Sequence, residues 1–152
     1  RISKSEAKQL MSDYFERFGG VKRYLDTVVQ RAKSLGHTTT VYGRRRPFPD
    51  LQSKIFQVRE NARRAALNAP IQGTAADIMK LAMIEVESGM LKDGLKSQLL
   101  LQVHDELVIA VAPGELEGVK KVALEKMTEV AKLSVPLDVH IGIGENWELA
   151  GH

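Results

Sequence analysis

The sequence predicts an α+β fold in which an antiparallel sheet, built around a β-hairpin, is backed by helices and preceded by a further group of helices. Two observations carry this prediction. The apolar runs 99–103 and 107–111 are separated by only three residues, a spacing typical of a tight antiparallel hairpin. Segments before and after the hairpin repeat apolar residues at helical spacing, so helices are available to cover the sheet.

The chain opens with two predicted helices. Ser3 and Ser5 offer oxygens that can cap a helix over 5–18, and two consecutive glycines are expected to end it. A second apolar stripe predicts a helix over 21–35, with a glycine as its C-cap.

The next stretch predicts a strand and then an interrupted helical region. The β-branched run 38–42 is typical of a strand, and Pro47 and Pro49 are expected to keep the following residues out of helix. A helix is expected from about residue 57 to 68, where Pro70 interrupts the pattern. A new core helix is expected to start near residue 69 and to continue to about residue 91, because proline is tolerated in the first turn of a helix.

After the hairpin the pattern predicts one more helix and one more strand. The helix is expected over 115–133, and the alternating segment 137–143 is typical of a half-buried strand. Trp147 is expected to anchor the tail in the core.

The composition excludes several classes of protein. No apolar run approaches the roughly 20 residues that a membrane-spanning helix needs. Zero Cys excludes disulfides, cysteine nucleophiles and Cys-based metal sites. Residues 44–64 carry seven Lys and Arg against two Asp and Glu, whereas residues 105–152 carry four against nine. The basic part indicates either a polyanionic partner or a solvated basic face.

The hairpin tip carries His104, Asp105 and Glu106. Carboxylate oxygens on a rigid hairpin suit a hard cation such as Mg²⁺, which keeps several of its waters and needs only one or two carboxylates. Turns also favour Asp, so a solvated acidic turn is the alternative. A metal site at Asp105 would need a further carboxylate from elsewhere.

Two groups of side chains point to nucleic acid. Arg64, Asn68 and Gln72 stand at i, i+4 and i+8 on an Ala-rich helix, hence on one face if the helical path survives Pro70. Their donors suit the acceptors that every base pair shows in the minor groove; the alternative is an ordinary solvated helix face. The run Arg44, Arg45 and Arg46 either holds phosphates or is a plain surface run.

Four segments, taken together, resemble the family A DNA polymerases. They are Arg64-Ala-Ala-Leu-Asn-Ala-Pro-Ile-Gln-Gly-Thr-Ala-Ala-Asp77, Leu101-Gln-Val-His-Asp-Glu-Leu107, Tyr42-Gly-Arg-Arg-Arg-Pro-Phe-Pro-Asp-Leu51 and Gly144-Glu-Asn-Trp147. Along the chain, the four segments occur in the same order as in the family. The resemblance covers essentially the whole chain.

The resemblance implies a polymerase fragment with an antiparallel palm sheet and a helical fingers remnant. Residues 1–60 would be the later part of the fingers, and residues 61–152 the C-terminal part of the palm. Asp105 would be one of two aspartates that hold the two catalytic Mg²⁺ ions, with Glu106 as its acidic neighbour. The other aspartate would lie before residue 1, so metal binding by the fragment alone is expected to be weak or absent.

The implied partners are primer–template DNA and deoxynucleoside triphosphates, with no membrane and a cytoplasmic, nucleoid location. Arg64, Asn68 and Gln72 would contact the primer–template from the minor groove, and His104 would lie against the primer end. The fragment alone is expected to be inactive without the remaining polymerase domains. The alternatives are a non-catalytic duplex DNA-binding module, which has no use for Asp105, and a structural interaction domain.

Overall fold

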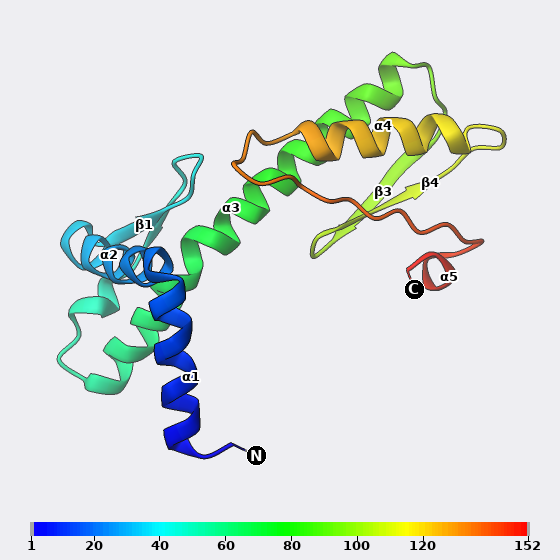
Figure 1. Ribbon diagram of the computed structural model, residues 1–152. Helices are drawn as coiled ribbons and strands as arrows, with labels where there is room; N and C mark the ends of the chain where they lie inside the picture. Colours follow the sequence, from blue (N-terminus) through cyan, green and yellow to red (C-terminus); the bar gives the residue numbers. More distant parts are fainter. Residues whose placement is uncertain (1, 152) are drawn as a thin grey trace. The chain divides into compact units, whose positions relative to one another are not determined.

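The computed structural model describes residues 2–151 and divides into two compact units, Arg1–Thr74 and Ala75–His152. The long helix α3 (Phe56–Lys92) gives its first part to one unit and its second part to the other. Each unit contains a two-stranded antiparallel sheet (Figure 1). Each also contains a cluster of buried apolar side chains. The predicted combination of helices with antiparallel strands is therefore confirmed.

The first unit begins with α1 (Lys4–Arg17) and α2 (Gly19–Leu35). The Ser3 hydroxyl accepts from the Glu6 N–H at 3.2 Å, and the Glu6 carboxylate accepts from the Ser3 N–H at 2.7 Å, which completes a capping box. That backbone hydrogen bond is the main reason why the pKa of Glu6 lies below its ordinary value.

The expected end of the first helix at the two glycines is wrong. Phe18, with φ −115° and ψ 50°, makes the break, and Gly19 already belongs to α2. The expected cap of the second helix is confirmed, because Gly36 has φ 74° and its N–H donates to the Ala32 carbonyl at 2.9 Å.

The strand expected over 38–42 is shorter than predicted, because the chain must turn within that run. Strand β1 (His37–Thr39) pairs antiparallel with β2 (Arg45–Pro47). Gly43, at φ 84°, donates its N–H to the Thr40 carbonyl at 3.0 Å in the turn between them. The expectation of no helix after the prolines is also wrong, since the 3₁₀ helix η1 (Pro49–Gln52) begins with a proline, which is tolerated at that position.

The core of the first unit is built on small residues. Ala32 of α2, Phe48 and Leu51 are buried together against α3, which contributes Ala62, Ala66 and Ala69. Alanines on one helical face allow the facing backbone to come close, so the opposite face of this part of α3 is left to solvent.

The predicted interruption at Pro70 is wrong, since α3 runs through it as one helix. Proline cannot donate to the carbonyl four residues earlier, a loss that costs about 3 kcal/mol in an isolated helix. Here Ala66, Ala69 and Pro70 are all buried, so packing offsets that cost. The Thr74 hydroxyl donates to the Pro70 carbonyl at 2.6 Å one turn later.

The second unit contains the predicted hairpin, β3 (Gln98–Val103) and β4 (Glu106–Ala110), with helix α4 (Leu116–Glu129) over it (Figure 1). Val86 and Met90 of α3 pack with Val119 and Val122 of α4. Leu95, Leu99, Leu107, Ile109 and Met127 pack against this cluster. The hairpin is thus held along one face by apolar contact.

Three expectations for the end of the chain are wrong. The helix ends at Glu129, before residue 133, and residues 137–143 form no strand, because no described segment pairs with them. Trp147 opens the short helix α5 (Trp147–Ala150) and is 49% exposed, so it does not anchor the tail in a core. Alternation alone does not make a strand where a hydrogen-bonded neighbour is lacking.

Candidate functional site

The tip of the β3–β4 hairpin is a two-residue turn formed by His104 and Asp105. Val103 pairs with Glu106 as the last pair of the ladder, so Glu106 belongs to β4 rather than to the turn. His104 has φ 53°, a conformation that His adopts more readily than most residues, and its carbonyl accepts from the Gln102 side chain. These contacts shape the turn that presents Asp105.

Asp105 is exposed, and its carboxylate makes no hydrogen bond or ion pair within residues 2–151. Glu106 is exposed beside it. Free carboxylate oxygens on a supported hairpin fit a partly hydrated Mg²⁺ ion. No group of three or more His, Asp or Glu side chains in the described part of the chain is arranged to hold a metal. Asp105 and Glu106 by themselves could therefore make up only part of a ligand set.

A hollow of about 210 Å³ lies on one side of Glu106. Its other lining residues are Trp147, Glu148 and Gly151, all at the end of the chain. The C-terminal helix α5 thus lies next to one of the two predicted catalytic carboxylates, which the sequence alone did not indicate.

Arg64, Asn68 and Gln72 are all exposed on the solvent side of α3. Because α3 is continuous across Pro70, the predicted i, i+4, i+8 spacing does place them on one face. The Arg64 guanidinium donates to the Asn61 side-chain oxygen at 2.6 Å, and the Gln57 amide donates to the same oxygen at 3.1 Å. Asn61 and Gln57 extend this polar stripe, and their four-residue spacing in the sequence would have revealed them.

The arginine run lies on the first unit's hairpin. Arg44 is in the turn, whereas Arg45 and Arg46 are in β2, and all three are exposed. The Arg46 guanidinium lies 5.2 Å from the centre of the Phe48 ring, which favours one orientation for it.

This basic hairpin is fastened to α3 one turn beyond Pro70. The Val41 N–H donates to the Thr74 hydroxyl at 3.1 Å. A Cβ on Gly73 would lie 2.7 Å from the Thr40 methyl carbon, so only glycine allows this approach. The arginines and the polar stripe therefore both belong to the first unit, while His104, Asp105 and Glu106 belong to the second unit.

The sequence alone did not indicate a role for Glu115, the residue before α4. Its carboxylate accepts from the N–H groups of Lys96 and Ser97 and from the Ser97 hydroxyl, at 2.7–2.9 Å. The Lys96 backbone bond is the largest of the causes that hold the pKa of Glu115 below its ordinary value, followed by the Ser97 hydroxyl. A glutamate following Pro-Gly just ahead of a helix was the available signal.

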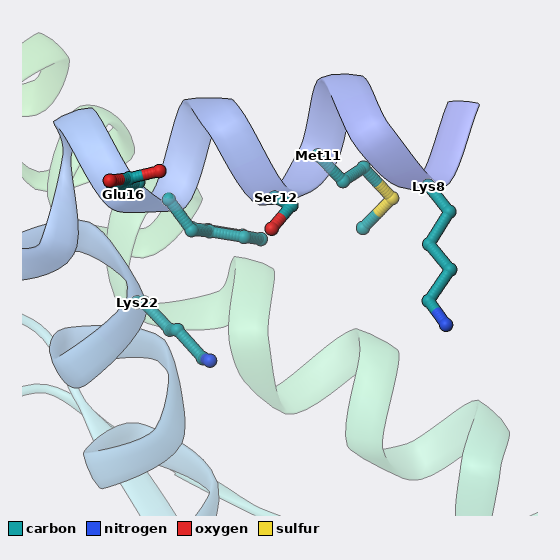
Figure 2. Close-up of a pocket in the computed structure, with 6 residues that line it drawn as sticks. Lys8, Met11, Ser12, Glu16 and Lys22 are labelled. Atoms are coloured by element: carbon teal, nitrogen blue, oxygen red, sulfur yellow. The ribbon is translucent and has the colours of Figure 1, made fainter. Parts of the chain in front are cut away.

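A second hollow, of about 510 Å³, lies on α1 and the start of α2 (Figure 2). It is lined by Lys8, Met11, Ser12, Phe15, Glu16 and Lys22. None of the predicted site residues lines it. Among the helices of residues 2–151, none combines the length and the apolar character needed to cross a membrane.

Comparison with known proteins identifies relatives over nearly the whole chain. The family model described as DNA polymerase family A matches residues 1–149. DNA polymerase I of Mycobacterium tuberculosis is 53% identical over 152 residues, which is all of this chain and 17% of that protein. DNA polymerase I of Streptococcus pneumoniae is 45% identical over 146 residues, 96% of this chain and 17% of that protein.

A solved structure is similar at the same level. It is the POL domain of Pol1 from M. smegmatis in complex with DNA primer-template and dNTP, with a TM-score of 0.95 and 52% identity, covering 99% of this chain and 27% of that one. The present chain thus spans 17% of the length of the curated relatives it matches. On these grounds the chain belongs to DNA polymerase family A.

Proposed function

We propose that this chain is part of a DNA-directed DNA polymerase that adds deoxynucleotides to a primer 3′ end. The observation that carries the proposal is the similarity, over 99% of the chain and at 52% identity, to a polymerase domain solved with primer-template and dNTP. The exposed Asp105 on its supported hairpin agrees with this role. In this proposal residues 1–60 form the later part of the fingers and residues 61–152 the C-terminal part of the palm.

In the proposed reaction the primer 3′-hydroxyl oxygen bonds to the α-phosphorus of the incoming triphosphate, and the bond to pyrophosphate breaks. Two Mg²⁺ ions, when bound, would stabilise charge on the attacking and leaving oxygens. Asp105 would supply one side of their ligand set, and Glu106 would act as a weaker or water-mediated ligand. A second aspartate from another part of the polymerase would complete the set.

The remaining site residues would hold the nucleic acid. Arg64, Asn68 and Gln72 donate from one exposed helix face, which suits the acceptors in the minor groove. Three exposed arginines on β2 and its turn suit phosphate oxygens. His104, next to Asp105 in the turn, would lie against the primer end. The protein would work on primer–template DNA and deoxynucleoside triphosphates in the bacterial nucleoid.

Primer extension by the polymerase that contains this chain tests the proposal. Asp105→Asn keeps the size of the side chain but removes its charge, so nucleotide incorporation should fall roughly 1,000-fold, since metal stabilisation is worth several kcal/mol. Primer–template affinity should stay within about twofold, because ground-state binding uses other contacts. Asp93→Asn, at an exposed aspartate after α3, is the matched control and should keep full activity.

Normal incorporation by Asp105→Asn would contradict the proposal. Loss of duplex binding with normal chemistry would make Asp105 structural. A wild-type protein that binds duplex DNA but never extends a primer would instead identify the non-catalytic binding module.

A further inference from the structure

At the end of the β3–β4 hairpin opposite its turn, the carboxylate of Glu115 binds the residues that lead into β3. Glu115 accepts from the Lys96 N–H with both oxygens at 2.9 Å, from the Ser97 N–H at 2.9 Å and from the Ser97 hydroxyl at 2.7 Å. Lys96 and Ser97 immediately precede β3, and Ser97 is only 8% exposed. The start of β3 is thereby tied to the residue from which α4 begins.

The same cluster also holds the end of β4. The Ser97 hydroxyl oxygen accepts from the Ala112 N–H at 2.9 Å, and Ala112 lies two residues beyond the last residue of β4. Ser97 therefore bridges the two strand ends, and Glu115 fixes Ser97. Charge-assisted hydrogen bonds of this kind are roughly twice as strong as neutral ones.

The support continues into α4. A Cβ on Gly118 would lie 3.3 Å from the nearest Leu95 methyl carbon, so the first turn of α4 lies directly on the loop that leads into β3. Leu95, Leu99 and Ile109 pack on the cluster that Val119 and Val122 build from the same helix. The direction in which the hairpin leaves α4 is set by these contacts together with the Glu115 carboxylate.

Apolar contacts hold one face of the hairpin, and a small change in the angle at which the strands leave their base is still magnified at the tip. Strand β3 has six residues, so at about 3.3 Å per residue the tip lies roughly 20 Å from the base. Over that length a tilt of about 3° moves the tip by roughly 1 Å, and a misplacement of that size at reacting groups can cost about 100-fold in rate. A change at the base can therefore reach Asp105 without touching it.

We propose that Glu115 is a positioning residue for nucleotide incorporation, because its carboxylate fixes the base of the hairpin and through it the place of Asp105. The proposal rests on the proposed polymerase function. It assigns Glu115 no contact with substrate or metal. Its effect should appear in the chemical step and in the Mg²⁺ requirement, and not in duplex binding.

The test uses the intact polymerase with single-turnover incorporation, Mg²⁺ titration, primer–template binding and thermal unfolding. In Glu115→Gln the side-chain NH₂ replaces one acceptor oxygen and faces an N–H donor. The hydrogen bonds to Lys96 and Ser97 are therefore weakened, while the volume of the side chain hardly changes. We expect the incorporation rate to fall about tenfold or more. The Mg²⁺ concentration for half-maximal rate should rise at least about threefold, because Mg²⁺ demands near-ideal ligand geometry. Primer–template affinity should change less than about twofold.

Four further variants separate positioning from general stability. Glu117→Gln alters an exposed glutamate in the first turn of α4, paired with Lys120 at 3.0 Å, and should behave as wild type. Glu115→Asp keeps the charge and should recover part of the rate. Ser97→Ala should act in the same direction as Glu115→Gln, and the double variant should be no slower than the slower single variant, since the two side chains act as one unit. If Glu115→Gln does not fold, Glu115→Asp and Ser97→Ala carry the same test.

The outcomes are distinguishable. A Glu115→Gln enzyme with the wild-type rate and Mg²⁺ requirement would overturn the positioning role. So would a rate loss that only matches the loss of folded protein, with the Mg²⁺ requirement unchanged. A wild-type polymerase that incorporates no nucleotide would overturn the proposed function, and the role of Glu115 with it.

Discussion

At the scale of single residues, α3 has one face that packs in the core and another whose polar side chains are exposed and, in the proposed function, would contact DNA. Ala62, Ala66 and Ala69 are buried on one side of the helix, and Asn68 and Gln72 are exposed on the other. A polar side chain that contributes nothing to the core can be truncated with little effect on stability. Substitutions on this face should therefore report on DNA contacts.

Removing a polar side chain from the exposed face of α3 should weaken the binding of DNA. In the intact polymerase, Gln72→Ala or Asn68→Ala should lower primer–template affinity or mismatch discrimination about fivefold to thirtyfold, as expected for one to two hydrogen bonds worth about 1 kcal/mol each. Equilibrium binding and single mismatched-nucleotide incorporation measure the two effects. Gln30→Ala, at an exposed glutamine on α2, is the matched control. If neither stripe variant differs from it, the stripe does not read the groove.

The arginines of the first hairpin should act through phosphate charge. In a plot of log affinity against log salt for primer–template binding, Arg45→Ala should reduce the steepness by about 1, because one released counterion corresponds to a slope of about 0.9. Arg17→Ala, at the end of α1, should leave the slope unchanged. An unchanged slope in Arg45→Ala would make β2 a plain surface strand.

At the scale of elements, the crossing of α3 and α4 depends on a residue without a side chain. A Cβ on Gly89 would lie 2.7 Å from a Val122 methyl carbon, closer than carbon atoms pack. Gly89→Ala gains up to about 1 kcal/mol of helix propensity but overpacks a core, which costs about 1–3 kcal/mol. We expect a net local destabilisation of about 1 kcal/mol.

Hydrogen exchange measures that local loss. Amides of α4 in Gly89→Ala should exchange about fivefold faster than in the wild-type protein. Ser88→Ala, at the exposed neighbouring position, should not accelerate them. Slower exchange in Gly89→Ala would contradict this prediction and would mean that α3 and α4 accommodate the added methyl group without loss of stability.

The hydrogen-bonded Glu115 carboxylate should make the stability of the second unit depend on pH. The pKa of Glu115 in the folded protein is below its ordinary value of 4.5, mainly because of the Lys96 N–H hydrogen bond. A carboxyl whose pKa is depressed by folding binds protons more readily when unfolded, so its stabilising contribution is present above pH 4.5 and is lost as the pH falls below that value.

Measuring the free energy of unfolding of the wild-type protein and of Glu115→Gln at several acid pH values tests this direction of the pH dependence. The wild-type protein should be the more stable of the two near neutral pH, and the gap should close as the pH falls below about 4.5. Circular dichroism across a urea series at each pH measures it. A gap that is constant with pH would show that the Glu115 carboxylate carries no linked proton.

At the scale of the whole molecule, the chain spans 17% of its relatives' length, and in the proposed reaction it would supply only one of the two aspartates. Residues 1–152 alone should therefore show no primer extension with Mg²⁺. The intact polymerase, assayed side by side, is the control. Clear extension by the purified 152-residue chain, with contaminating polymerase excluded by an Asp105→Asn preparation, would contradict this division of labour.

Much of this molecule follows from the sequence alone. The capped first helix, the tight antiparallel hairpin and the helical spacing of Arg64, Asn68 and Gln72 are local consequences of turn residues and apolar periodicity. The sequence predicted a three-residue connection in the hairpin, whereas the structure has a two-residue turn because Glu106 pairs with Val103. Membership of a polymerase family was also readable from its motifs and agrees with the matched family model. The roles of the individual site residues stay predictions.

Tertiary structure alone decided the rest. Proline breaks an isolated helix, but burial of the neighbours of Pro70 keeps α3 continuous. The residues that bury them are distant in the sequence, so the local sequence around Pro70 could not predict this. Residues 137–143 have the right alternation but no neighbouring strand, and strand formation needs one. Glu115 joins segments about 18 residues apart, so its hydrogen bonds exist only once α4 and the hairpin meet. Local chemistry determined which residues can act, and long-range contact determined where they are held.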